Sequence, residues 1–97
     1  MTEVRVVIFE VGSNRDIGTV TWSEGTVTVS VEQAGHRREI QRIFDETGEM
    51  TLAWVGRNGE EMRPIRRAPG SLQWFDAILF QILPESGYRY RRVEVTD

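Results

Sequence analysis

The sequence predicts an α+β domain, with a mostly antiparallel sheet and two helices packed on one face of it. Strand-like segments with alternating apolar residues recur along the chain, and only two stretches show helical periodicity. Short turn signals join neighbouring strands, which favours antiparallel hairpins. The predicted order along the chain is βββ-α-ββ-α-β. The 97 residues, 39% hydrophobic and 28% charged, suffice for one core, so we expect a single domain over residues 1–97.

The first predicted strand, residues 4–11, is rich in β-branched side chains and apolar on both alternating faces at its centre. This pattern is typical of a strand that is covered on both sides or lies in the middle of its sheet. Residues 12–16 have the composition of a turn and end this strand.

The next two strands, within residues 17–31, form the clearest predicted hairpin. Glu24 and Gly25 suit a two-residue loop. At that register, apolar residues face apolar residues and hydroxyl residues face hydroxyl residues. The facing pairs are Ser23 with Thr26, Trp22 with Val27, Thr21 with Thr28, and Val20 with Val29. A slip of one residue would break every match, so the pattern fixes the register.

The first helix is expected over residues 36–47. Ile40, Ile43 and Phe44 share one face at helical spacing, and Gly48 follows at the position of a helix stop. We expect this apolar stripe to pack on the sheet.

A second hairpin is predicted from the alternating strand 50–55 and the turn signal of Asn58 and Gly59. A type I′ turn there would pair Arg57 with Glu60, Val55 with Met62, and Trp54 with Arg63. Pro64 has no backbone N–H, so the returning strand is expected to be short or to lie at an edge.

The second helix follows Ser71, a suitable N-cap, and is expected to end before Pro84. At about 100° per residue, a broad apolar arc of this helix faces the core. Its members are Leu72, Trp74, Phe75, Ile78, Leu79, Ile82 and Leu83.

The opposite face of this helix is thinly polar and carries an aromatic side chain. Either the chain's own loop before Pro69 covers it, or a partner does. We predict that it binds a protein partner or a second copy of the chain, with contact residues Gln73, Ala77, Phe80 and Gln81. The favoured function is therefore non-enzymatic protein–protein contact, homodimerisation included.

The last predicted strand, residues 88–95, changes its apolar parity along its length. Its two tyrosines share one parity and its two valines share the other. A β-bulge near Arg91 and Arg92 would bring all four side chains onto one core-facing side. The four are Tyr88, Tyr90, Val93 and Val95.

Residue types that support catalysis or metal binding are scarce. The chain has no cysteine and one histidine, His36, expected to be partly buried in the first turn of its helix. No serine lies in a nucleophile elbow, and neither a calcium loop nor a phosphate loop is present. We therefore expect no enzyme activity, no metal and no cofactor. A small hydrolase is the least favoured class, because it would need His36 beside a serine or carboxylate in a cavity.

The start of the chain lacks the basic and apolar segments of a secretory signal, and no apolar run approaches the roughly 20 residues of a membrane span. We expect a cytoplasmic protein without membrane association. The absence of cysteine agrees with a reducing compartment.

All twelve basic residues are arginines. Codon usage in a GC-rich genome accounts for this, as would selection for bidentate pairing. Near the end of the chain, arginines alternate with tyrosines as in single-strand binders, which makes a nucleic-acid-binding accessory protein the alternative prediction. Its candidate contacts are Arg66, Arg67, Arg89, Arg91 and Arg92. The net charge of −3 argues against general binding of polyanions.

Overall fold

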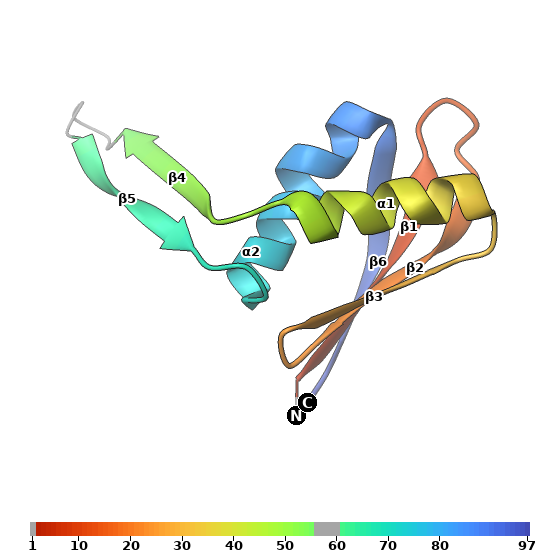
Figure 1. The fold of residues 1–97 in the computed structure, drawn as a ribbon, viewed down its shortest axis with the longest axis horizontal. Coiled ribbons are helices and arrows are strands. Elements are labelled where there is room, and N and C mark those ends of the chain that lie inside the picture. Colours follow the sequence, from red (N-terminus) through yellow and green to blue (C-terminus); the bar gives the residue numbers. More distant parts are fainter. Residues whose placement is uncertain (1, 56–60) are drawn as a thin grey trace.

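A computed structural model describes the backbone of residues 2–55 and 61–97 and the side chains of residues 2–51 and 66–97 (Figure 1). The elements are β1 Glu3–Glu10, β2 Asp16–Ser23, β3 Thr26–Val31, α1 Ala34–Glu46, β4 Met50–Val55, β5 Glu61–Arg67, α2 Leu72–Ala77, a π-helical segment Ile78–Ile82, a 3-10 turn Leu83–Ser86, and β6 Tyr88–Thr96. The α+β class and the predicted order of strands and helices are confirmed.

Four strands form an antiparallel sheet in the order β3-β2-β1-β6. The first strand is central, as its composition predicted. Its inward residues Val4, Val6 and Ile8 are buried, whereas Arg5 on the opposite face is exposed. The helices cover only the inward face of the sheet. The central position of β1 in the sheet therefore explains its apolar character better than burial of both of its faces does.

The β2–β3 hairpin has the predicted register, with Trp22 opposite Val27 and Val20 opposite Val29. Glu24 and Gly25 both have positive φ, at 47° and 88°. Two consecutive positive φ angles are those of a type I′ turn, whose twist matches the twist of the flanking strands.

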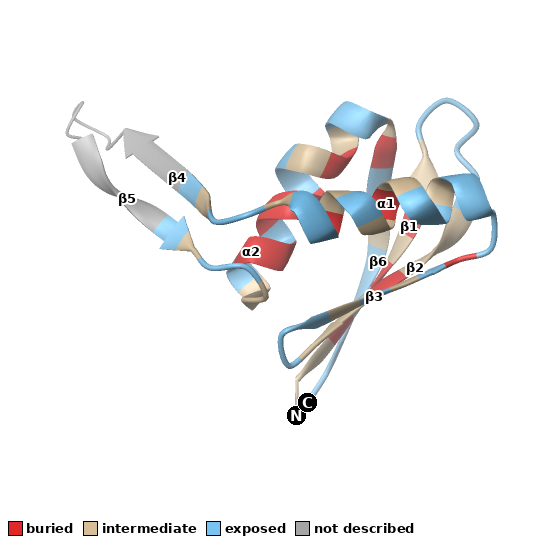
Figure 2. Cartoon of the chain, viewed as in Figure 1, coloured by how far each residue is buried: buried red, intermediate tan, exposed pale blue. Residues whose placement is uncertain are grey.

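Both helical segments contribute to a single core over the inward face of the sheet, where the buried residues of Figure 2 gather. The α1 helix begins two residues earlier than predicted, because Gln33 caps it by accepting a hydrogen bond from the His36 backbone N–H at 2.9 Å. Ile40 and Phe44 then point inward and are buried, as the stripe predicted.

Two tryptophans anchor loops to this core. Trp22 Nε1 donates to the Gly70 carbonyl at 2.8 Å, and Trp74 Nε1 donates to the Gly48 carbonyl at 2.9 Å. Each indole thus satisfies its one polar group while its ring packs among apolar side chains. Both tryptophans therefore act as core anchors.

The second hairpin, β4 with β5, extends away from the four-stranded sheet (Figure 1). Its predicted register holds where Met50 faces Arg67 and is wrong nearer the turn, where Trp54 faces Met62. An irregularity between Leu52 and Trp54 causes this shift of one residue. The predicted turn at Asn58 and Gly59, and the pair Arg57 with Glu60, lie outside the described residues.

The second helix ends before Pro84, as predicted, although a separate 3-10 turn follows it. Ser71 caps α2 as predicted, its side chain accepting a hydrogen bond from the Trp74 backbone N–H at 3.2 Å. Beyond Ala77 the helix widens into the π segment, and Pro84 sits in the first turn of the 3-10 helix that follows. Proline is tolerated there because the first N–H groups of a helix have no partner within it. Gly87, at φ 85°, ends the helical path.

The predicted bulge in β6 is confirmed. The pairing with β1 shifts at Val6, and Arg92 has a positive φ of 52°. The bulge places the tyrosines and valines on the inward face, but Val93 and Val95 are 52% and 62% exposed. The two valines therefore lie on the core-facing side, as predicted, but they stay exposed because the helices do not cover this end of the strand.

None of the described helices has the length and apolar composition needed to cross a bilayer. The longest of them, α1, has 13 residues. A membrane-spanning helix requires roughly 20 residues that are mostly apolar.

A substitution in β2 tests the closeness of the hairpin strands. A Cβ atom at Gly18 would lie 2.8 Å from Val31 Cα, which is backbone and cannot rotate away. We expect Gly18→Ala to lower the free energy of unfolding by about 2–3 kcal/mol, measured by denaturant titration with tryptophan fluorescence. Gly48→Ala is the matched control, since a Cβ there meets no atom within 4 Å. Equal midpoints for the two variants would contradict the close approach.

Candidate interaction surface

Phe80 lies in the π segment and is 71% exposed, the highest value among the exposed large hydrophobic side chains of the described chain. Its neighbours Ile78 and Leu79 are buried in the core. The predicted wheel therefore places Phe80 correctly outside the core, and the loop before Pro69 does not cover it.

A hollow of about 540 Å³ lies between this helical segment and β6. From the helical side it is lined by Ala77, Leu79, Phe80 and Gln81, and from the strand side by Tyr90 and Val93. A second hollow of about 420 Å³ shares Leu79, Phe80 and Tyr90. Phe80 thus stands between two adjoining concave regions of the surface.

The four predicted contact residues have different positions. Phe80 and Gln81 are exposed at the hollow, and Ala77 lines it although it is only 2% exposed. Gln73 is exposed but does not line the hollow. The wheel assigned Ala77 to the solvent face, whereas its short methyl group is covered by its surroundings.

Sequence reasoning missed Tyr90, Val93 and Val95 as members of this surface. The predicted bulge had already placed them on the inward face of the last strand. Their exposure follows from where the helices end over the sheet, which depends on tertiary packing rather than on the strand's own sequence.

Two charged groups form the polar rim of the hollow. Arg67 Nη1 donates a hydrogen bond to the Gln73 carbonyl of α2 at 3.0 Å. Asp76 lies further along the same helix and also lines the hollow. Partial burial raises the pKa of Asp76, and the charge of Arg67 opposes this rise. The rim therefore carries one group of each sign.

The candidate nucleic-acid contacts do not form one basic patch. Arg91 Nε lies 3.2 Å from Asp16 Oδ1, and its guanidinium stacks 4.0 Å above the Phe9 ring. Arg92 Nη2 lies 3.7 Å from the other oxygen of Asp16, so one carboxylate faces both arginines. Arg66 Nε lies 3.8 Å from Glu49 Oε1 on the distant hairpin.

The tyrosines that alternate with these arginines face the core. Tyr88 is 3% exposed, and Tyr90 is half-buried against the core. Base stacking requires an open aromatic face. Arg89 is exposed beside Phe80, in the second hollow, and it belongs to the same surface as the apolar residues.

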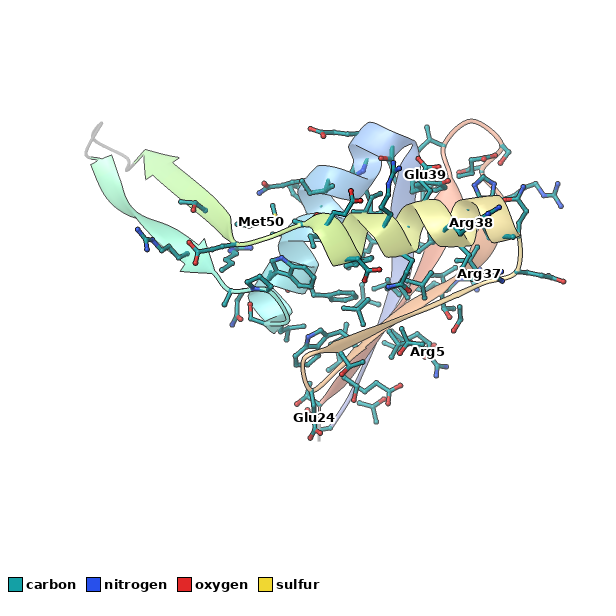
Figure 3. The ribbon with its side chains drawn as sticks, in the orientation of Figure 1. Arg5, Glu24, Arg37, Arg38, Glu39 and Met50 are labelled. Carbon is teal, nitrogen blue, oxygen red and sulfur yellow. The ribbon has the colours of Figure 1, made fainter. Side chains whose placement is uncertain are left out.

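His36 joins three elements through side-chain contacts. Its Nδ1 lies 2.7 Å from the Tyr88 hydroxyl, which donates to Glu39 Oε2 at 3.0 Å. Its Nε2 lies 3.3 Å from Glu10 Oε2. Figure 3 labels Glu39 on α1, and these contacts tie the start of that helix to β1 and β6. The side chain is partly buried, as predicted.

The hydrolase alternative required His36 beside a serine or carboxylate in a cavity. His36 does line a hollow of about 520 Å³ with Glu10 and Ser13. However, Ser13 Oγ donates to Glu10 Oε1 at 3.2 Å, and both ring nitrogens of His36 already face other oxygens. Glu10 is thus the carboxylate beside His36 that this alternative required, whereas Ser13 contacts Glu10 and not the imidazole.

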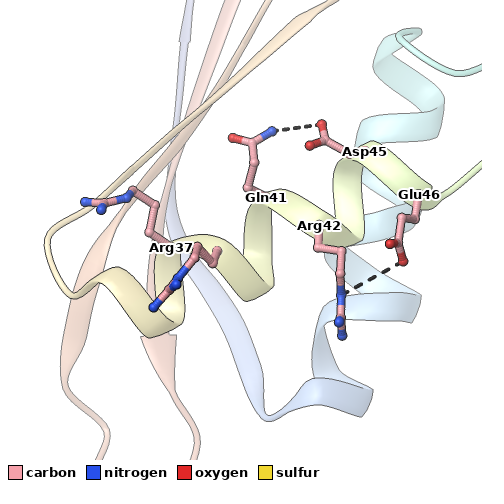
Figure 4. Close-up of a pocket in the computed structure, with 6 residues that line it drawn as sticks. Arg37, Gln41, Arg42, Asp45 and Glu46 are labelled. Carbon is pink, nitrogen blue, oxygen red and sulfur yellow. Dashed lines mark hydrogen bonds and ion pairs between the residues drawn. The ribbon is translucent and has the colours of Figure 1, made fainter.

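Two side-chain pairs join successive turns on the solvent face of α1 (Figure 4). Gln41 Nε2 donates to Asp45 Oδ1 at 3.0 Å, and Arg42 Nε lies 3.9 Å from Glu46 Oε2. Such i,i+4 pairs are typical of a solvated helix face. We therefore assign no binding role to this surface.

Comparison of the chain with family models, curated proteins and solved structures found no match. The function proposed below therefore rests on the residues and their geometry. Of the surfaces described above, the hollow beside Phe80 has both an exposed aromatic anchor and an adjoining uncovered strand.

Substitution of Tyr88 tests the contacts of His36. We expect Tyr88→Phe to lower the free energy of unfolding by about 1–2 kcal/mol near neutral pH, because His36 and Glu39 lose the hydroxyl between them. Burial and the bond to Glu39 raise the pKa of Tyr88 to about 12. The tyrosine phenol of the unfolded chain ionises near pH 10, whereas the native state keeps this proton to a higher pH. The wild type therefore loses stability as the pH rises from about 10 to 12.

The measurement is denaturant unfolding of both proteins near neutral pH and near pH 11. The stability gap between wild type and Tyr88→Phe should narrow at the higher pH. A gap that is constant, or that widens, would contradict the assigned hydroxyl contacts.

Proposed function

We propose that this protein is a non-enzymatic module that acts through protein–protein contact at the hollow beside Phe80. The observation that carries this proposal is the 71% exposure of Phe80 at a hollow that it shares with Val93, an exposed valine of β6. Single exposed apolar residues need no explanation, but a contiguous apolar strip at a concave site is typical of interaction surfaces.

The shape of the surface supports a contact of this kind. Phe80 is flanked by exposed polar side chains, Gln81 and Arg89, while Leu79 and Tyr90 supply apolar walls. An aromatic anchor surrounded by polar residues is the usual composition of a binding hot spot, where truncation costs about 2 kcal/mol or more. We expect the protein to act in the cytoplasm.

Nucleic-acid binding is the alternative function. Arg89 and Arg92 are exposed on one strand, which is the observation in its favour. Arg92 faces Asp16, however, and the net charge is −3. Affinity for a phosphate backbone depends on net neutralisation of its charge, so this alternative has weaker support.

Site-specific photocross-linking in cells of the organism whose genome encodes the protein tests the proposed contact. Benzoylphenylalanine replaces Gln81 at the hollow or, as a control, Gln41 on the charged face of α1. We expect an adduct of defined mass from position 81 and none from position 41. Adding Phe80→Glu should reduce the yield at position 81 at least ~10-fold, because a charge would be buried in the contact.

Phe80→Glu should leave the fold intact, since the side chain is mostly exposed, and its free energy of unfolding should change by no more than about 0.5 kcal/mol. This control separates loss of contact from loss of structure. An adduct yield that is equal at both positions, or that ignores Phe80→Glu, would refute the proposal.

Fluorescence anisotropy with a labelled single-stranded oligonucleotide tests the alternative. We expect no association at physiological salt, and none that follows the steep salt dependence of phosphate contacts. Tight binding that Arg89→Ala and Arg92→Ala weaken together would instead support the nucleic-acid function.

A further inference from the structure

The four-stranded sheet has two edges, and they differ in how their inward side chains are covered. On the β3 edge, Val27 and Val29 are half-buried against the core. On the β6 edge, Val93 and Val95 are more than half exposed. An edge strand presents unpaired backbone N–H and C=O groups, and here these groups adjoin uncovered apolar side chains. The β6 edge is therefore the one suited to accept a further strand.

The bulge at Arg92 sets which side chains such a strand would meet. Before the bulge, Tyr90 faces inward opposite Ile8, and after it Val95 faces inward opposite Val4. The charged side chains Arg91 and Glu94 alternate with them and face outward, opposite Val7 and Arg5. The free edge of β6 thus has an apolar inward row and a charged outward row.

The charges of β6 are also divided along the strand. Its first half carries Arg89, Arg91 and Arg92, and its end carries Glu94 and Asp97. An antiparallel partner with the same sequence would place an acidic half against each basic half. A polyanion or a uniformly basic segment would match one half only.

From these features we infer that the occupant of this edge is a second copy of the chain, paired through antiparallel β6 strands about a two-fold axis at Val93. This inference deepens the proposed function and rests on it. If Arg92 is skipped at the bulge, which lies between Arg91 and Glu94, Val93 faces Val93 of the second copy. Tyr90 then faces Val95 of the second copy, and Arg91 faces its Glu94. Both inward pairs are apolar, and of the two outward pairs Arg91 with Glu94 is of opposite charge, while Arg89 faces Thr96.

This pairing gives one continuous sheet of eight strands, four from each copy. In this pairing, Phe80 of each copy lies at the hollow beside the two paired β6 strands, where it covers inward-facing side chains. The interface is small, so we expect a dissociation constant on the order of 10 μM. High salt weakens it, because the facing charges are exposed to solvent.

Cysteine cross-linking tests the register, since the native chain contains no cysteine. Directly opposed residues in an antiparallel pair have Cα atoms about 4.5–5.5 Å apart, within the range that a disulfide spans. Val93→Cys should therefore form a disulfide-linked dimer in a glutathione redox buffer. Val95→Cys is the control on the same strand, because its two copies would be about 13 Å apart. Thr28→Cys is the exposed control on the β3 edge.

We expect the cross-linked fraction of Val93→Cys to exceed that of both controls at least ~10-fold. Sedimentation equilibrium of the wild type should show a mass that rises with concentration from one chain toward two. Glu94→Arg, which makes β6 basic over most of its length, should weaken this association about 10-fold. Equal cross-linking at the three positions, or a wild type that remains a single chain, would overturn the inference.

These outcomes separate the inference from the proposed function. A foreign polypeptide cross-linked at position 81, with no Val93→Cys dimer, would overturn the second copy as occupant and leave the proposed contact in place. A Val93→Cys dimer that Phe80→Glu does not weaken would support the strand pairing and refute the role of the hollow.

Discussion

The packing of Phe44 against Trp74 and Phe75 fixes the arrangement on which the candidate surface depends. The ring of Phe44, from α1, lies 5.7 Å from that of Phe75 and 6.0 Å from that of Trp74, both from α2. This cluster joins the two helical segments over the inward face of the sheet. The helices do not cover the end of β6, where Val93 and Val95 remain exposed. The exposed valines thus lie where helical cover of the sheet ends.

The features predicted correctly from the sequence are those decided by near neighbours. The register of the first hairpin follows from a two-residue loop at Glu24 and Gly25 and from matched pairs on both strands. The exposure of Phe80 follows from helical periodicity alone. The irregularity between Leu52 and Trp54, by contrast, has no signature in the turn chemistry of the second hairpin. The exposure of the β6 valines required knowing where another element ends.

The bulge at Arg92 links local strain to the candidate surface. A non-glycine residue at φ 52° occupies the left-handed region, which is costly for a side chain with a Cβ atom. Without the extra residue, Val93 and Val95 would face the uncovered outward side of the sheet together with Arg89 and Arg91. The strain therefore places apolar side chains beside Phe80. The bulge also keeps the apolar side chains of β6 on one face of the sheet and its charged side chains on the other. The proposed strand pairing with another chain depends on this separation.

The charged side chains of β6 that argue against nucleic-acid binding support the proposed contact with a protein. Asp16 draws Arg91 and Arg92 across the outward face of the sheet, so their positive charge is partly neutralised within the chain. What remains on β6 is a separation of charge along the strand rather than an excess of one sign. An electrostatic pattern of that kind contributes little to affinity for a phosphate backbone, but it discriminates between partner orientations. In the proposed dimer, apolar contact at Phe80 and Val93 would supply affinity, and the separation of charge along β6 would select the antiparallel arrangement.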